Sequence, residues 1–173
     1  FYKQVMLHPE AKPNAGHYAL ARLEKQGRLK AVVTQNIDGL HQDAGSRNVL
    51  ELHGTVRRNL CLACNRVMDL QAVLSQPGTP RCACGGTLRP DIVFYGEPLN
   101  PDVMDEAVRV VMKCDLLIVG GTSLTVYPAA GLLGYRREAR LALLNRDETP
   151  FDQRADLIVR DSIAQALDAA IPR

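Results

Sequence analysis

Short apolar runs that end abruptly on polar side chains are the parts of this sequence best suited to chemistry. Residues 31–33 are apolar, and Gln35, Asn36 and Asp38 follow them almost directly. Val49, Leu50 and Leu52 repeat this apolar character just before His53. An imidazole titrates near neutral pH, so a histidine placed beside amide and carboxylate groups can act as a general base.

The same residues also have a purely structural interpretation. His53 could simply end a strand, and Asn36 and Asp38 could form Asx turns, which short polar side chains favour. Residue types and spacing are compatible with both interpretations, and they leave the choice open.

Four of the five cysteines lie close together in the sequence, at Cys61, Cys64, Cys82 and Cys84. Two pairs at this separation are typical of zinc ribbons, and four thiolates would fill a tetrahedral site, so the predicted zinc is structural. The second pair is C-x-C, one residue shorter than the usual spacing. We therefore expect either that the local turn adapts or that zinc binds less tightly. The alternative is a set of four free thiols.

Length and composition limit the classes of protein to consider. A chain of 173 residues can build one sizeable core, and 46% hydrophobic with 23% charged residues is ordinary for a soluble globular protein. A net charge of +2 does not indicate nucleic acid as a direct partner. No apolar run is long enough to cross a bilayer, and the first residues lack a secretory pattern. We expect a cytoplasmic protein without a membrane partner.

Helical and strand patterns alternate along the chain, which predicts an α/β fold with a doubly wound parallel sheet. Asn14 is expected to cap a first helix, and Asn100 with Pro101 to open another. Ser162 and Gln165 form a predicted capping box for the last helix. In that helix the inward-facing residues are expected to be Ile163, Leu167, Ala170 and Ile171.

Small and polar residues follow the later predicted strands. Gly121, Thr122 and Ser123 come after residues 116–119, and Asn145 and Ser162 follow two further apolar runs. Because ligands of open parallel sheets bind outside the carboxyl ends of the strands, these residues predict a nucleotide crevice.

Several segments together resemble one known family. TQNIDGLH, followed by ELHG, is similar to the central signature of the sirtuins, the NAD-dependent protein lysine deacylases. The paired cysteines, LRPDIVFYGE and GGTSLTVYPAAG follow in the family's order. The resemblance, to the bacterial type, implies a Rossmann-like doubly wound parallel sheet in residues 1–54 and 92–173, incomplete at the amino terminus. It also implies a small inserted zinc-ribbon module in residues 55–91.

The resemblance further implies the role of each matching residue. His53 is the expected catalytic base, and Asn36 is expected to orient the cofactor ribose and a water. Val93, Phe94 and Gly96 match the strand that pairs with an acylated-lysine peptide. The expected NAD-binding residues are Gln35, Asn36, Ile37, Asp38, Gly121, Thr122, Ser123, Asn145, Ser162 and Ile163. The implied reaction transfers the acyl group from a protein lysine to ADP-ribose and releases nicotinamide.

The sequence also departs from the family's pattern. A glycine-rich strand-to-helix turn that cradles the cofactor's pyrophosphate is not found in these residues, so we expect no useful activity from this chain alone. Two functions remain open: a deacylase represented here in part, or a catalytically inactive zinc-bearing module that binds a peptide or partner. Tyr2 is followed by Val5 and not by an arginine, with Lys3 between them, which predicts a preference for neutral acyl groups such as acetyl.

Overall fold

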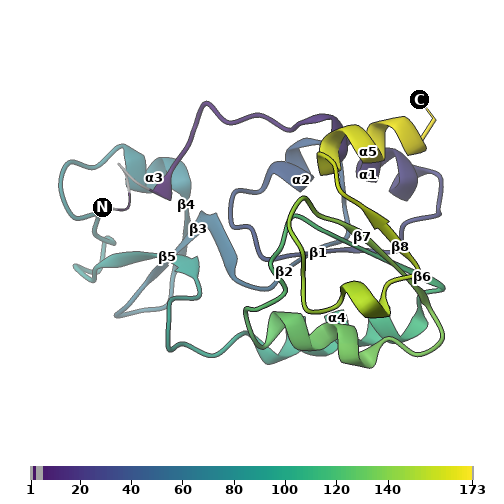
Figure 1. Cartoon of the computed structure of the whole chain (residues 1–173). Coiled ribbons are helices and arrows are strands. Elements are labelled where there is room, and N and C mark those ends of the chain that lie inside the picture. The colour runs from purple at the N-terminus through teal and green to yellow at the C-terminus, as the bar shows by residue number, and fades with distance from the viewer. Residues whose placement is uncertain (1, 3–5, 173) are drawn as a thin grey trace. The chain divides into compact units, whose positions relative to one another are not determined.

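The computed structural model describes residue 2 and residues 6–172, and it divides into two compact units (Figure 1). Unit 1 comprises Phe1–Ala11, Thr34–Gly39 and Glu51–Leu99, and unit 2 comprises Lys12–Val33, Leu40–Leu50 and Asn100–Arg173. Lys3 and Val5, on which the predicted acyl preference depends, lie outside the described residues.

The boundaries of unit 1 are wider than those of the predicted 55–91 module. Ile37 packs against a small core that contains Val56 and Ile92, and its carbonyl accepts a hydrogen bond from the Val56 N–H at 3.0 Å. These contacts join the segment around Ile37 to the cysteine-bearing part of the chain. The predicted inserted module and part of the predicted Rossmann-like region therefore share one unit.

Unit 2 is built around a parallel sheet whose strands end at one edge. Strands β6 (Leu116–Gly120), β7 (Arg140–Leu144) and β8 (Leu157–Val159) lie side by side in that order (Figure 1). Gly120 pairs with Leu144, which in turn pairs with Val159. Because the three last residues are in register, the loops that follow them begin at the same edge.

Helices cover both faces of this sheet, as expected for a doubly wound arrangement. On one face, α1 (Ala15–Lys25) and α5 (Ile163–Ala170) pack beside each other over Ala142 and Leu144 (Figure 1). On the other face, the 3-10 helix η2 (Ala129–Tyr135) packs through Leu133 against Leu141 and Leu143, and α4 (Pro101–Lys113) lies next to η2. Alternate residues of β7 therefore enter different cores.

The helix starts confirm two predicted caps and correct a third. The Asn14 side chain accepts hydrogen bonds from the N–H groups of α1, and Asn100 does the same for α4. Ser162 precedes α5 but makes no side-chain cap, so the predicted capping box is wrong. Its own N–H donates instead to the Asp161 carboxylate at 2.6 Å. Ala170 was expected to face inward and is exposed.

Unit 1 contains an antiparallel sheet in the order β4–β3–β5. Its elements are β3 (Gly54–Cys61), β4 (Val67–Asp69), α3 (Leu70–Leu74) and β5 (Leu88–Ile92). Cys61, Val73, Cys82 and Leu88 form a buried cluster in this unit. Two of the predicted zinc ligands thus also belong to its core.

The remaining elements include a second pair of strands. Strands β1 (Val32–Thr34) and β2 (Val49–Glu51) form a two-stranded sheet, with α2 (Leu40–Asp43) between them in sequence, and η3 (Asp152–Arg154) precedes β8. Within the described part of the chain, no strand joins this sheet to β6–β7–β8. The fold class is confirmed, with the Rossmann-like strands divided between two sheets. None of the described helices is long and apolar enough to cross a membrane.

Candidate functional sites

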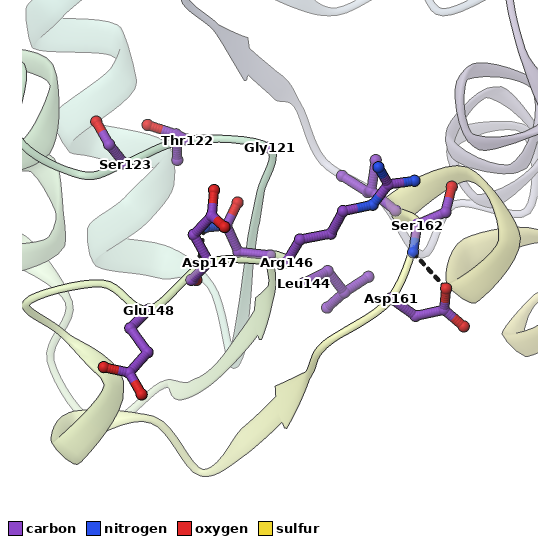
Figure 2. Close-up of a pocket in the computed structure, with 11 residues that line it drawn as sticks. Gly121, Thr122, Ser123, Leu144, Arg146, Asp147, Glu148, Asp161 and Ser162 are labelled. Atoms are coloured by element: carbon purple, nitrogen blue, oxygen red, sulfur yellow. Dashed lines mark hydrogen bonds between the residues drawn. The ribbon is translucent and has the colours of Figure 1, made fainter.

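A pocket of about 370 Å³ opens at the carboxyl ends of the parallel strands of unit 2 (Figure 2). This volume falls in the range of roughly 300–1,000 Å³ that is typical of small-molecule and cofactor sites. Its lining residues are Gly121, Thr122, Ser123, Leu144, Asn145, Arg146, Asp147, Glu148, Asp161, Ser162 and Ile163. The pocket thus brings together every cofactor-binding residue that the sequence predicted in unit 2.

Two glycines, the last residue of β6 and the residue after it, shape this side of the pocket. Gly121 adopts a positive φ of 63°, which glycine tolerates and other residues rarely do, and no atom would lie within 4 Å of an added Cβ. At Gly120 an added Cβ would lie 2.2 Å from Cδ1 of Ile163 and 3.0 Å from the Leu144 carbonyl oxygen. The end of β6 can therefore approach the start of α5 closely only because Gly120 has no side chain.

Charged residues of the pocket wall were missed by the sequence analysis. These residues are Arg146, Asp147 and Glu148, which come after β7 and Asn145, and Asp161, which precedes Ser162. Charged residues in a loop usually indicate a solvated surface, so the residue types alone do not predict that these side chains line a binding pocket. Figure 2 shows Arg146 extending from the end of β7 toward the Ser162 side of the pocket. The lining therefore combines one cation with three carboxylates.

His53, in unit 1, is held by a backbone carbonyl. Its Nδ1 lies 3.0 Å from the Gln35 carbonyl oxygen, and the side chain is partly buried. A carbonyl can only accept a hydrogen bond, so Nδ1 must carry the proton in this contact. In the neutral ring Nε2 is then unprotonated. This tautomer, assigned from the contact, is the form that a general base requires.

The predicted nicotinamide-contact segment lies in the same unit as His53. The Asn36 N–H donates to the Thr34 hydroxyl at 3.0 Å, while the Asn36 side chain is exposed. The Asp38 carbonyl accepts from Nε of Arg57 at 3.3 Å. With the Ile37 carbonyl bonded to β3, the backbone of residues 35–38 is fixed at several points. Unit 1 therefore presents these residues from a constrained loop.

The predicted peptide-binding strand follows β5. The Val93 N–H donates to the His53 carbonyl at 3.0 Å, and Phe94, Tyr95 and Gly96 are exposed. This contact ties the predicted peptide strand to the backbone of the predicted base. Tyr95 was not predicted as a site residue, although it lies within the LRPDIVFYGE segment.

An arginine–glutamate pair closes the turn that contains these residues. Arg89 donates from both terminal nitrogens to the Glu97 carboxylate at 2.8 Å, and its guanidinium lies 5.0 Å from the centroid of the Phe94 ring. The Arg89 bond and the Phe94 N–H hold the pKa of Glu97 at about 2, below its ordinary 4.5. The turn is therefore anchored by an ionised pair over a wide pH range.

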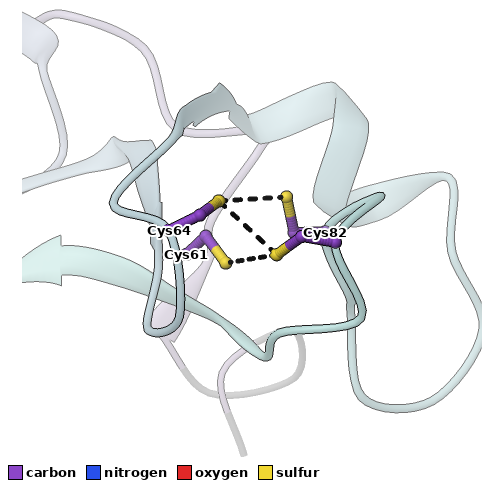
Figure 3. Close-up of side chains that lie close together, drawn as sticks. Cys61, Cys64 and Cys82 are labelled. Carbon is purple, nitrogen blue, oxygen red and sulfur yellow. Dashed lines mark hydrogen bonds between the residues drawn. The ribbon is translucent and has the colours of Figure 1, made fainter.

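The four clustered cysteines place their sulfurs close together in unit 1 (Figure 3). The Cys61–Cys84, Cys64–Cys84 and Cys64–Cys82 sulfurs are 3.4, 3.5 and 3.8 Å apart, and all four lie within 4.8 Å of one another. Four thiolates around one zinc, at about 2.3 Å each, would be about 3.8 Å apart. The observed distances fit such a site.

The short C-x-C pair reaches this geometry through the glycines that follow it. The Gly85 N–H donates to the Cys82 carbonyl at 2.8 Å, and Gly85 has a φ of 85°. A Cβ on Gly86 would lie 2.7 Å from both the Cys61 sulfur and the Ala63 Cβ. The turn thus accommodates the short spacing, and the strength of zinc binding stays a prediction.

The thiols of this cluster differ in acidity. Burial acts to raise the pKa of Cys61, but the N–H groups of Ala63 and Cys64 outweigh it and lower the pKa to about 6. At Cys64 the Arg66 N–H lowers the pKa, but the neighbouring thiols Cys84 and Cys61 raise it to about 12. Packing several thiolates together without a cation is therefore costly, which is the problem that a bound divalent metal solves.

The sequence and the fold both match known proteins. The sequence pattern of the Sir2 family matches residues 1–128. A protein named NAD-dependent protein deacetylase in Cutibacterium acnes is 52% identical over 98% of this chain and 69% of its own length. One of the same name in Clostridium tetani is 53% identical over 99% of this chain and 70% of its own.

A solved structure gives the same result. Sir2 in complex with the inhibitor EX-527, 2′-O-acetyl-ADP-ribose and a deacetylated p53 peptide has a TM-score of 0.87 and 41% identity. The match covers 93% of this chain and 71% of that one. This chain belongs to the Sir2 family.

Proposed function

We propose that this protein is an NAD-dependent protein lysine deacetylase, and that the activity of the 173-residue chain alone stays a separate question. The observation that carries the proposal is the strand-end pocket, because residues that resemble the family's cofactor contacts line one cavity at the edge where nucleotides bind in open α/β sheets. The names of its relatives and the acetyl-ADP-ribose bound to a similar structure support the cofactor and the substrate class. They favour the enzyme over the non-catalytic alternative.

In unit 2, we assign the pocket to the nucleotide part of NAD. The exposed backbone at Gly121 allows close approach, and the side chains of Thr122, Ser123 and Asn145 supply hydrogen-bonding groups around the cavity. When bound, NAD would supply an electrophilic ribose carbon and a nicotinamide leaving group. The chain's residues would bind and orient it.

In unit 1, we assign proton transfer to Nε2 of His53. The Gln35 carbonyl holds the ring in the tautomer that leaves Nε2 free to accept a proton from a ribose hydroxyl. Asn36 exposes an amide suited to orient that ribose and a water. We assign the acylated peptide to the exposed residues Phe94 and Gly96, in the turn after β5. Each role follows the family's pattern.

We further propose that Cys61, Cys64, Cys82 and Cys84 bind one structural zinc ion. The close approach of the four sulfurs supports this assignment. Four thiolate ligands leave no position for a substrate or a reactive water, so the metal would stabilise unit 1 without acting in catalysis. A cytoplasmic location would keep these thiols reduced, and it stays a prediction.

The experiment that tests this function is a product balance with the protein as expressed in its source cell. An acetyl-lysine peptide is incubated with and without NAD, and deacetylated peptide, nicotinamide and acetyl-ADP-ribose are measured by mass spectrometry. We expect the three products in equal amounts and only with NAD. Deacetylation without NAD, or nicotinamide release that does not require the peptide, would overturn the proposal.

A further inference from the structure

One wall of the strand-end pocket is a loop that pairs with β8 at its first residue, where the Asn145 N–H donates to the Val159 carbonyl at 3.1 Å. Asn145, Arg146, Asp147 and Glu148 follow β7 and line the cavity, and the last three are exposed. The other walls begin at the ends of β6 and β8 and at the start of α5. A wall of exposed loop residues needs side-chain contacts to keep one shape.

Arg160, just after β8, makes those contacts from outside the pocket. Its Nη1 donates to the Asn145 carbonyl at 3.1 Å and to the Asp147 carbonyl at 2.8 Å. Its Nη2 pairs with the Asp152 carboxylate. Arg160 is not among the lining residues, so it acts on the loop's backbone and not on a ligand.

Asp152 secures the far end of the same loop. Its Oδ1 accepts from the Thr149 hydroxyl at 2.7 Å and from the Thr149 N–H at 3.1 Å. These bonds, together with Arg160, lower the pKa of Asp152, and Thr149 is buried. The pair of Arg160 and Asp152 therefore holds the loop at both of its ends.

The contacts also reach a predicted cofactor residue. The Asn145 side-chain amide donates to the Asp147 carbonyl at 2.9 Å, and the same carbonyl accepts from Arg160. The orientation of the Asn145 amide in the pocket therefore depends on a carbonyl that Arg160 fixes. A planar guanidinium can serve three acceptors at once, whereas a lysine ammonium is a point charge on a flexible stem.

We propose that Arg160 is a positioning residue for nucleotide recognition, acting through the backbone of residues 145–149. The inference rests on the proposed function, which assigns the pocket to the nucleotide of NAD. Loss of Arg160 weakens nucleotide binding by loosening one wall while β6, β7 and β8 keep their places. In the active protein this raises KM for NAD and leaves kcat and the KM for the peptide nearly unchanged.

The test is an NMR titration of the 173-residue chain with ADP-ribose, which measures dissociation constants into the millimolar range. Arg160→Ala is compared with Arg160→Lys, which keeps the charge and removes the fork. Arg109→Ala is the matched control, because Arg109 forms an exposed pair with Glu106 on α4. Amide hydrogen exchange at residues 145–149 and the melting temperature are recorded for each variant.

We expect Arg160→Ala to weaken ADP-ribose binding about tenfold and to speed exchange at residues 145–149. Arg160→Lys should lie between Arg160→Ala and the wild type, and Arg109→Ala should bind as the wild type does. Wild-type affinity in both Arg160 variants would overturn the inference alone. Absence of ADP-ribose binding by the wild type would contradict the assignment of this pocket to the nucleotide, and the inference with it, whereas the product balance described above tests the deacetylase function separately. If Arg160→Ala does not fold, the lysine variant decides.

Discussion

The cysteine cluster of unit 1 and the strand-end pocket of unit 2 are assembled in opposite ways. The cluster takes all its predicted ligands from residues 61–84, at the end of β3 and on turns beside its antiparallel sheet. The pocket takes its lining from three segments that follow β6, β7 and β8. A local site can be identified from spacing, whereas a pocket formed from separate segments appears only once the order of the strands is known.

The two sites also depend on different forces. Four sulfurs within 4.8 Å of one another would repel as thiolates in the absence of a cation, so a metal and the fold of unit 1 should stabilise each other. The pocket lies beside a sheet with cores on both faces, and it should persist without a ligand. This difference predicts separable effects of mutation in the two regions.

Removing one cysteine should have the largest effect. Cys61→Ser removes a buried sulfur that is both a predicted ligand and part of the core of unit 1. We expect zinc content to fall from about one per chain to near zero and unit 1 to lose protection from proteolysis, because metal binding is coupled to folding. Metal analysis and limited proteolysis measure this.

The control for that variant is Cys114→Ser, because Cys114 lies outside the cluster and donates to the Val111 carbonyl. It should retain zinc. A well-folded Cys61→Ser protein, or a wild type without metal after preparation with zinc, would contradict the structural-zinc assignment.

A glycine next to the cluster should matter next. In Gly86→Ala, the new Cβ would collide with the Cys61 sulfur, which cannot move without changing the ligand geometry. Overpacking of this kind costs about 1–3 kcal/mol, so zinc affinity should fall about 10- to 100-fold while ADP-ribose binding is unchanged. Competition with a chromophoric chelator measures the affinity. The control is Gly134→Ala, where no atom lies within 4 Å of the added Cβ.

The corresponding glycine of the pocket should show the reverse pattern. In Gly120→Ala the new Cβ meets the flexible end of Ile163, which can shift but lines the pocket. We expect ADP-ribose binding to weaken about tenfold, with zinc content unchanged. Calorimetric titration with ADP-ribose measures the binding loss, and Gly134→Ala again serves as the control. Equal losses of zinc and nucleotide in both glycine variants would show that the two regions are not independent.

The smallest effect should be the pH dependence of the turn at residues 93–97. Because the folded-state pKa of Glu97 is about 2 and its ordinary value is 4.5, its pair with Arg89 stabilises the turn fully above about pH 4.5. The contribution is lost as the pH falls from 4.5 toward 2. An NMR titration of the Glu97 carboxyl carbon measures this pKa, and Glu97→Gln should remove the pH dependence. A midpoint near 4.5 would contradict the anchored turn.

These contrasts explain how much the sequence could predict. Asn14 and Asn100 were identified as caps because capping depends on neighbouring residues, and the cysteines were identified because their spacing is local. Gly121, Asn145 and Ser162 could be placed at strand ends, and the parallel register then brought them to one pocket. Their roles in binding NAD stay predictions.

Other features depend on contacts that no local pattern encodes. Arg160 reaches back to the carbonyls of Asn145 and Asp147, and such side-chain-to-backbone bonds leave no periodic signal. Ser162 fails to cap α5 although its spacing to Gln165 fits a capping box. The adaptation of the C-x-C turn likewise depends on the close approach of Gly86 to Cys61.

The central claim is that this protein deacetylates lysine with His53 as the base, and one measurement tests it most directly. NAD-dependent deacetylation of an acetyl-lysine peptide is measured for the wild type and for His53→Ala, with both proteins prepared in the form that the source cell expresses. The melting temperature and the ADP-ribose affinity of the two proteins are measured as well, to show that the variant folds and binds the nucleotide as the wild type does. Loss of a general base typically costs about 100-fold or more, and we predict that loss in kcat. Near-wild-type turnover by a folded His53→Ala protein would contradict the account.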